Sequence, residues 1–176
     1  TTNALDEYSV SPNGKLISYV VRGDVFVKRN DKEDKRSVRL TTGAARDRDV
    51  AWLDDNTVLF VSDRDGQNDI FAVTSADSEE PNLFRSLKHS VKPVTRTDAE
   101  EHEPLVSPDG KKVAYREGRG KLIVADVADD QSLTNPVVLL DGWATPSGVS
   151  WSPDSQWLAY AKSDLSFNSE IFIHAA

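Results

Sequence analysis

Residues 106–115 read VSPDGKKVAY, and residues 151–160 read WSPDSQWLAY, which repeats nearly the same text. Pro108 fixes its φ at about −65°, Asp109 suits the next turn position, and Gly110 can take a positive φ without a Cβ clash. A three-residue loop of this kind, a type I turn followed by a left-handed residue, joins two antiparallel strands. The stretch therefore predicts a β-hairpin, and its recurrence predicts a repeated unit.

A version of this code opens four units, which start roughly 40 to 55 residues apart. The openings are Val10–Gly14, Trp52–Asn56, Val106–Gly110 and Trp151–Ser155. A period in this range is typical of propellers and other arrays built from one supersecondary unit. The spacing is irregular because the connecting loops differ in length, which surface loops tolerate.

The strand after each turn has a fixed pattern, an aliphatic residue two positions before an aromatic one. Side chains two positions apart share one face of a sheet. The residue between them is mostly small, as expected where the other face lies close against a neighbouring sheet. The pairs are Ile17 and Tyr19, Val58 and Phe60, Val113 and Tyr115, and Leu158 and Tyr160, with Ser18, Leu59, Ala114 and Ala159 between them.

Two further strands are predicted in the units. Runs rich in β-branched and aromatic residues predict a third strand at Asp24–Val27, Asp69–Ala72, Lys121–Val124 and Glu170–Ile173. Weaker runs predict an outer strand at Val38–Thr41, Pro93–Thr95 and Val137–Leu140, and the fourth unit has none. Each complete unit is thus a four-stranded antiparallel sheet.

These units predict an all-β chain, a partial β-propeller of about three and three-quarter four-stranded blades. We expect residues 1–176 to form a single propeller segment with blades at approximately 6–47, 48–101, 102–142 and 147–176, the last one incomplete. A β-sandwich would give no reason for the same code to recur in the same order.

Two segments depart from the repeat. The second hairpin lacks both Pro and Gly, and Asp55–Asn56 predicts a two-residue turn in left-handed geometry that preserves the strand register. Residues 80–88 carry apolar residues with helical spacing, which predicts one or two helical turns inserted before the outer strand. We expect Leu83, Phe84 and Leu87 to cap the edge of this blade.

Composition excludes several classes of function. The 21 Lys and Arg residues against 29 Asp and Glu give a net charge of −8, which opposes binding to nucleic acid. No apolar run approaches the ~18 residues that a membrane helix needs, so no membrane insertion is expected. The absence of Cys excludes disulfides and thiolate chemistry, and with only three His any zinc site would need carboxylates. Because it contains no Met, even at its first position, we expect a segment of a longer or processed polypeptide.

No motif specifies a reaction, a metal or a cofactor. Residues 63–69 alternate oxygen side chains like a calcium loop, but Gly66 stands at the fourth position instead of the sixth, so a polar hairpin is predicted. The acidic run 98–103 is expected to be solvated. The sequence has no G-x-S-x-G elbow, so no catalytic residue is assigned. The remaining polar candidates for a rim or channel are Arg46, Asp47, Arg48 and Asp49.

The repeat code resembles the WD40-like repeat shared by TolB, by the propellers of prolyl oligopeptidase relatives and by the tricorn protease. A set of further stretches extends the resemblance over essentially the whole chain, to the N-terminal propeller region of bacterial tricorn-like serine peptidases. These stretches are Arg22–Phe26, Arg39–Thr41, Arg46–Asp49, Leu139–Gly148 and Asn168–His174.

The resemblance implies that the chain belongs to a larger parent protein, whose PDZ-like module and peptide-hydrolysing catalytic domain lie outside this chain. It also implies that the propeller filters or channels peptides or unfolded polypeptide. An alternative is the protein-binding propeller of a TolB-like envelope scaffold without hydrolytic activity, and a third is a prolyl oligopeptidase relative with an α/β-hydrolase domain. A periplasmic or otherwise extracytoplasmic location is expected. Exposed blade edges also predict self-association.

Overall fold

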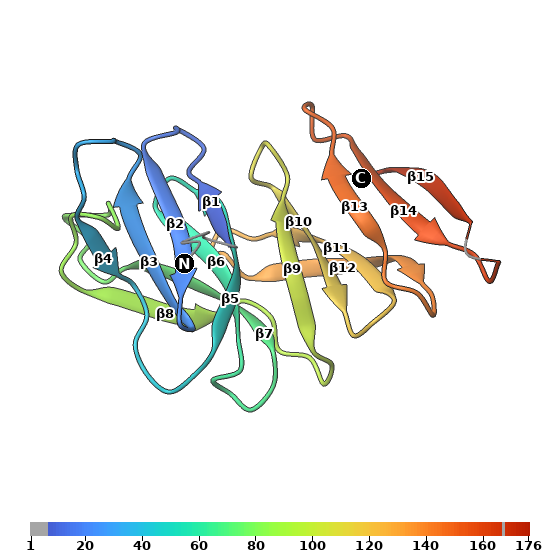
Figure 1. The fold of residues 1–176 in the computed structure, drawn as a ribbon, viewed down its shortest axis with the longest axis horizontal. Helices are drawn as coiled ribbons and strands as arrows, with labels where there is room; N and C mark the ends of the chain where they lie inside the picture. Colours follow the sequence, from blue (N-terminus) through green and yellow to red (C-terminus); the bar gives the residue numbers. More distant parts are fainter. Residues whose placement is uncertain (1–6, 167) are drawn as a thin grey trace, which may run out of the picture. The chain divides into compact units, whose positions relative to one another are not determined.

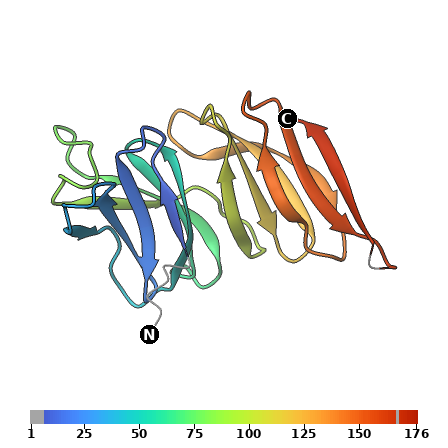
Figure 2. The same ribbon diagram turned by 45° about the horizontal axis from the view of Figure 1, so that its top comes forward.

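The computed structural model describes residues 7–166 and 168–176, and within them all regular structure is β-strand (Figure 1). The strands form four antiparallel sheets, each with its strands in chain order (Figure 2). The first sheet contains β1 (Tyr8–Val10), β2 (Leu16–Val21), β3 (Asp24–Arg29) and β4 (Ser37–Arg39). The second contains β5 (Asp47–Asp54), β6 (Thr57–Ser62), β7 (Asp69–Ser75) and β8 (His89–Pro93).

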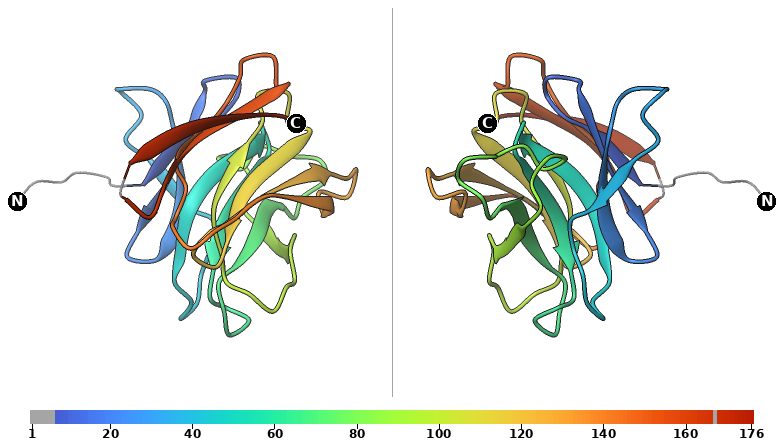
Figure 3. Two further views of the ribbon diagram at one scale, coloured as in Figure 1. Left: turned by 90° about the vertical axis from the view of Figure 1, so that its right-hand side faces the viewer. Right: turned by 90° about the vertical axis from the view of Figure 1, so that its left-hand side faces the viewer.

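The third sheet contains β9 (Glu101–Val106), β10 (Lys112–Glu117), β11 (Lys121–Val127) and β12 (Leu133–Asp141). The fourth contains only β13 (Ser147–Trp151), β14 (Trp157–Ser163) and β15 (Ser169–Ala175). These sheets are the blades of a partial β-propeller, with three four-stranded blades and a three-stranded fourth, so the predicted fold is confirmed. Figure 3 shows the strands of the individual blades from two further sides. The described residues contain no helix long and apolar enough to cross a membrane.

The chain divides into two compact units, residues 1–98 and residues 99–176. The first unit holds the first and second blades, and the second unit holds the third and fourth. Each unit therefore contains one complete junction between consecutive blades.

The repeated turn is held by its own side chains. The hydroxyl of Ser107 donates to the carboxylate of Asp109 at 2.7 Å and accepts the amide of Lys112 at 3.0 Å. Gly110 takes the predicted positive φ, 72°, and its amide donates to the carbonyl of Ser107. The hydrogen bond from Ser107 lowers the pKa of Asp109. The residues that the code repeats are therefore those that close the hairpin.

The same hydrogen bonds recur in the first and fourth blades, at Ser11 with Asn13 and at Ser152 with Asp154. In the fourth blade Ser155 replaces the glycine and still takes a φ of 62°. Its hydroxyl accepts the amide of Asp109 from the third blade at 3.0 Å. A glycine could not make that bond, which explains a serine in a conformation that usually favours glycine.

The core of the first unit lies between its two blades. It contains Val25 and Val27 of β3 together with Phe60 of β6 and Phe71 of β7, all at most 2% exposed. Trp52, at the end of β5, belongs to the same cluster. Between the hairpin tips, the amide of Asn13 donates to Asp55 at 2.9 Å. The second unit repeats this arrangement, with Ala114, Leu122 and Val124 of the third blade against Leu158 and Tyr160 of the fourth.

The expectation for the second hairpin is half right. The turn has two residues, Asp55 and Asn56, but neither takes a positive φ. The carboxylate of Asp54 accepts the amide of Asn56 at 2.7 Å and the hydroxyl of Thr57 at 3.1 Å. The register also shifts by one residue between Trp52 and Asp54. An aspartate that bonds to the backbone two residues later therefore replaces the left-handed geometry.

Two predictions about the second blade are wrong in detail. Its outer strand is His89–Pro93, earlier than the predicted Pro93–Thr95. The inserted segment forms a single turn at Asn82–Ser86, in which the amides of Arg85 and Ser86 donate to the carbonyl of Asn82, so it is the shorter of the one or two helical turns predicted. Leu83 and Phe84 are buried as expected, whereas Leu87 is 95% exposed. A single turn can direct only adjacent side chains inward, which leaves Leu87 in solvent.

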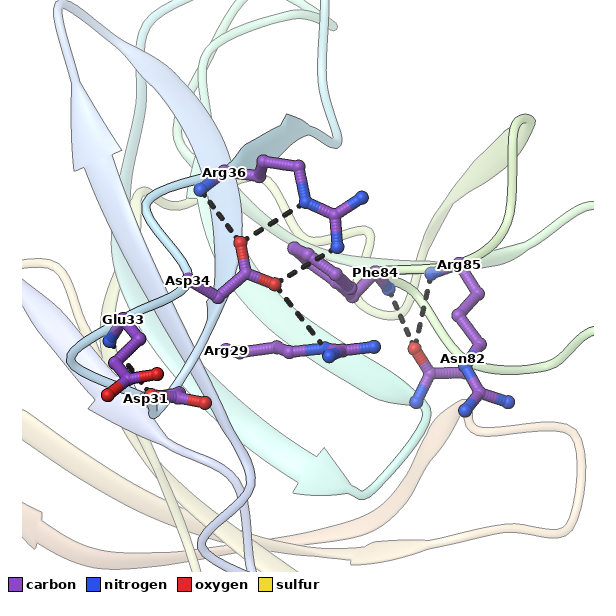
Figure 4. A network of polar contacts seen from close by, with 8 residues as sticks. All are labelled: Arg29, Asp31, Glu33, Asp34, Arg36, Asn82, Phe84 and Arg85. Atoms are coloured by element: carbon purple, nitrogen blue, oxygen red, sulfur yellow. Dashed lines mark hydrogen bonds and ion pairs between the residues drawn. The ribbon is translucent and has the colours of Figure 1, made fainter.

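The inserted segment is anchored by cations on the first blade (Figure 4). The guanidinium groups of Arg29 and Arg36 lie 5.1 and 5.3 Å from the centroid of the Phe84 ring. Asp34 holds both arginines, through an ion pair of 3.0 Å to Arg36 and one of 3.7 Å to Arg29. The hydrogen bond from Arg36 lowers the pKa of Asp34 to about 2. The segment thus connects the two blades of the first unit at their outer ends.

Candidate functional site: a polar cleft beside the inner-strand bulge

The inner strands of three blades carry the same bulge. In each of them a residue with a left-handed φ stands three positions before the residue that opens the repeated turn code. These residues are Asp49 in β5, Glu103 in β9 and Gly148 in β13, with φ values of 53°, 52° and 61°, before Trp52, Val106 and Trp151, respectively. At each of them the strand register shifts by one residue. Bulges of this kind bend a strand and redirect its side chains, and they are enriched next to functional sites.

The sequence-predicted residues Arg46, Asp47, Arg48 and Asp49 fall in and before the first of these bulges. Asp47 is buried, its amide donates to the carbonyl of Gly23 at 2.9 Å, and its carboxylate accepts Arg64 at 2.9 Å. The amide of Asp49 donates to the carboxylate of Glu7 at 3.0 Å. Asp47 therefore has a structural role in joining strands and loops.

The arginines of this stretch face a polar cleft of about 510 Å³ in the first unit. Arg46, Asp47 and Arg48 line one side, and the hairpin between β2 and β3 supplies the other. The lining residues are Glu7, Val20, Arg22, Gly23, Arg46, Asp47 and Arg48. Sequence analysis missed Glu7 and Arg22, because only the pairing of the first blade with the second brings them to β5.

Arg22 is held in an uncommon backbone conformation at the cleft. With φ values of 55° and 84°, Arg22 and Gly23 form a two-residue hairpin loop of the type that favours Asn-Gly. A left-handed φ at a residue with a long side chain costs roughly 1 kcal/mol. A methyl group on Gly23 would lie 3.5 Å from the Cα of Arg46, so this loop packs against the residue that directly precedes β5. The loop places a guanidinium group at the cleft despite that cost.

Three guanidinium groups line the cleft against the two carboxylates of Glu7 and Asp47, which leaves an excess of positive charge that favours an anion. Within residues 7–166 and 168–176, none of the guanidinium groups of Arg22, Arg46 and Arg48 forms an ion pair, and the Nε of Arg48 is buried without a hydrogen-bond partner. Asp47 is already neutralised by Arg64. Since guanidinium groups pair with carboxylates and phosphates through parallel hydrogen bonds, the cleft can bind an anionic group but offers no nucleophile and base.

The other polar stretches have structural partners. In the loop at 63–69, Asp63 accepts the amide of Arg46 at 2.7 Å, and the guanidinium group of Arg64 lies 5.0 and 4.9 Å from the ring centroids of Phe60 and Phe71. In the acidic run, Glu103 binds Arg116 through two hydrogen bonds of 2.8 and 2.7 Å. No group of three or more His, Cys, Asp or Glu side chains within the described part of the chain is arranged to hold a metal ion.

No family model and no curated protein sequence matches the chain. Solved structures do match. The tricorn protease superposes on 97% of the chain, with a TM-score of 0.71 and 16% sequence identity. TolB from Acinetobacter baumannii superposes on 98%, with a TM-score of 0.66 and 21% identity. A puromycin-hydrolyzing peptidase of Mycobacterium tuberculosis superposes on 98%, with a TM-score of 0.67 and 15% identity. The chain spans only 15%, 40% and 27% of these structures, respectively. At such identities the likeness establishes the propeller fold.

Proposed function

We propose that this chain is the non-catalytic propeller segment of a tricorn-like serine peptidase, which gates or channels peptides toward a catalytic domain outside residues 1–176. The proposal rests on one observation, the three guanidinium groups that line a single cleft beside the inner strand of the second blade and form no ion pair within the part of the chain that the structure describes. A peptide carries carboxylates at its C-terminus and on acidic side chains, which such a cleft can bind. The solved structures most similar in fold include two peptidases, which is consistent with this assignment.

A binding measurement tests the proposal. Fluorescence anisotropy would follow a labelled hexapeptide with a free C-terminal carboxylate, beside the same peptide amidated at its C-terminus. Arg48→Gln removes a guanidinium group from the cleft, and Arg85→Gln serves as the matched control because Arg85 is exposed outside it. We expect Arg48→Gln to weaken binding at least fivefold and Arg85→Gln to leave it unchanged. Equal affinities for both variants and the unsubstituted chain would refute a role of the cleft in peptide binding.

The propeller is proposed to leave bond cleavage to another domain. Incubation of the purified chain with a peptide library, followed by mass spectrometry, should therefore detect no new termini. Cleavage that persists through further purification and disappears on substitution of a residue in this chain would contradict the proposal.

A TolB-like scaffold that binds folded proteins is the second candidate, and the structure of TolB from Acinetobacter baumannii matches the chain about as well as those of the peptidases. The same cleft would then receive an acidic segment of a protein partner. Sequence adjoining these residues distinguishes the two, because a PDZ-like module with a serine peptidase domain supports the first candidate. An extracytoplasmic location is part of both proposals and is testable by fractionation of cells that produce the parent protein.

A further inference from the structure

The polar cleft of the first unit contains a negative charge that is not neutralised. Glu7 lines this cleft together with the three guanidinium groups, and within residues 7–166 and 168–176 its carboxylate forms no ion pair with any of them. The other acid in the lining, Asp47, is 3% exposed and is paired with Arg64 at 2.9 Å. A free carboxylate and three free guanidinium groups therefore share one cleft.

Backbone hydrogen bonds fix the position of Glu7. Its Oε2 accepts the amide of Asp49 at the bulge of β5, at 3.0 Å, and its main-chain carbonyl accepts the amide of Val20 in β2, at 3.3 Å. An ionised carboxylate has about four acceptor positions, so the bond from Asp49 leaves capacity for a ligand. The negative charge thus stands at a set place beside the positive group instead of being cancelled by it.

A cleft with separate positive and negative groups is complementary to a ligand that carries both charges. The guanidinium groups can bind a carboxylate through parallel hydrogen bonds. Glu7 attracts a cation on the same ligand and repels a second carboxylate, and such arrangements of charge decide between competing partners. A peptide combines the two charges in one residue where its last residue is lysine or arginine. The cleft of about 510 Å³ is within the range of about 300–1,000 Å³ that is usual for ligand sites.

We propose that Glu7 makes the polar cleft selective for peptides that end in lysine or arginine, against peptides that end in aspartate or glutamate. This inference rests on the proposed function, because it requires the cleft to bind a peptide carboxylate. It adds the class of peptide and the residue that selects it. If Glu7 served only to hold the bulge of β5, a glutamine would serve equally well, since its side-chain carbonyl can accept the same amide of Asp49.

Four hexapeptides with the same N-terminal label test the selectivity by fluorescence anisotropy. Three of them differ only in the last residue, which is lysine, Nε-acetyllysine or glutamate, and the fourth is the lysine peptide amidated at its C-terminus. Acetylation keeps the aliphatic part of the lysine side chain and removes its charge. We expect the lysine peptide to bind at least fivefold more tightly than the acetyllysine peptide, and the glutamate peptide to bind more weakly than either. Amidation should weaken binding of the lysine peptide at least fivefold.

Glu7→Gln removes the charge and keeps the acceptor for the amide of Asp49. It should reduce the preference for lysine over acetyllysine to less than twofold without weakening the binding of the acetyllysine peptide. Glu33→Gln is the matched control, because Glu33 is exposed and lies outside the cleft, and it should leave the preference unchanged. The preference of the unsubstituted chain requires no substitution, so it tests the proposal even if Glu7→Gln does not fold.

Arg48→Gln separates this inference from the proposed function. If Arg48→Gln weakens binding while the unsubstituted chain binds the lysine and acetyllysine peptides equally, or while the preference persists in Glu7→Gln, the selectivity is refuted and the proposed function stands. Equal binding of the amidated and free lysine peptides would show that the guanidinium groups do not bind the terminal carboxylate, which also overturns the selectivity. If none of the peptides binds, or if Arg48→Gln changes no affinity, the proposed function fails and the inference fails with it.

Discussion

Replacement of Trp52 by alanine should be among the most destabilising single changes in the first unit. The side chain is 5% exposed, lies in the cluster between the two blades and donates its N–H to the carbonyl of Ser9 at 3.0 Å. Truncation of a buried tryptophan to alanine typically costs 3–5 kcal/mol through lost contacts and the cavity that remains, so we expect about 4 kcal/mol. Trp52→Phe retains most of the apolar contact and loses the hydrogen bond, so we expect roughly 1 to 2 kcal/mol.

Urea denaturation monitored by far-ultraviolet circular dichroism measures these losses. With an m-value of about 2 kcal/mol/M, a loss of about 4 kcal/mol lowers the midpoint of the first unit by about 2 M. The control is Trp157→Ala, because Trp157 is 47% exposed and lines an open cleft on the fourth blade, and it should cost less than about 1 kcal/mol. Equal losses for Trp52→Ala and Trp157→Ala would refute the assignment of Trp52 as the element that joins the blades. Wild-type stability of Trp52→Phe would refute a contribution of its hydrogen bond.

Three further predictions concern the first unit. Phe84→Leu keeps an apolar side chain and removes both cation–π contacts, with Arg29 and with Arg36. Urea titration should show a free energy of unfolding that is lower by about 1 kcal/mol. An unchanged free energy would contradict the anchoring role of Phe84. The pKa of Asp34 falls from 3.8 to about 2 on folding, so the stabilising contribution of its carboxylate is full above pH 3.8 and is lost as the pH falls through about 2. The difference in unfolding free energy between the unsubstituted chain and Asp34→Asn should therefore shrink over that pH range. A difference that stays constant would exclude the carboxylate as its source. Asn tolerates the left-handed backbone of Arg22 better than Arg does, so Arg22→Asn should raise the free energy of unfolding measured in urea by about 0.5 to 1 kcal/mol. The same substitution should weaken peptide binding several-fold. A fall in stability would show that the backbone of Arg22 is not strained.

The features that were predictable from sequence are those in which residues act on near neighbours. The serine and aspartate of the repeated turn bond to each other and to amides within five residues, so the hairpins could be identified from the text alone. The error at Leu87 has a related cause, because helical spacing does not reveal that the segment makes only one turn. The polar cleft could not be predicted, since Glu7 and Arg22 meet Arg48 only after two blades have packed together.

The alternation of valine and tryptophan at one aligned position relates the sequence to the two compact units. The aligned residues are Val10, Trp52, Val106 and Trp151, so an indole ends the inner strand of every second blade. Each of these indoles bonds to the blade that precedes it, Trp52 within the first compact unit and Trp151 within the second. A buried tryptophan covers about 150–250 Å² of surface, far more than a valine can, so an indole makes a strong connection between consecutive blades. The pairing of blades into units therefore follows from which repeats carry tryptophan.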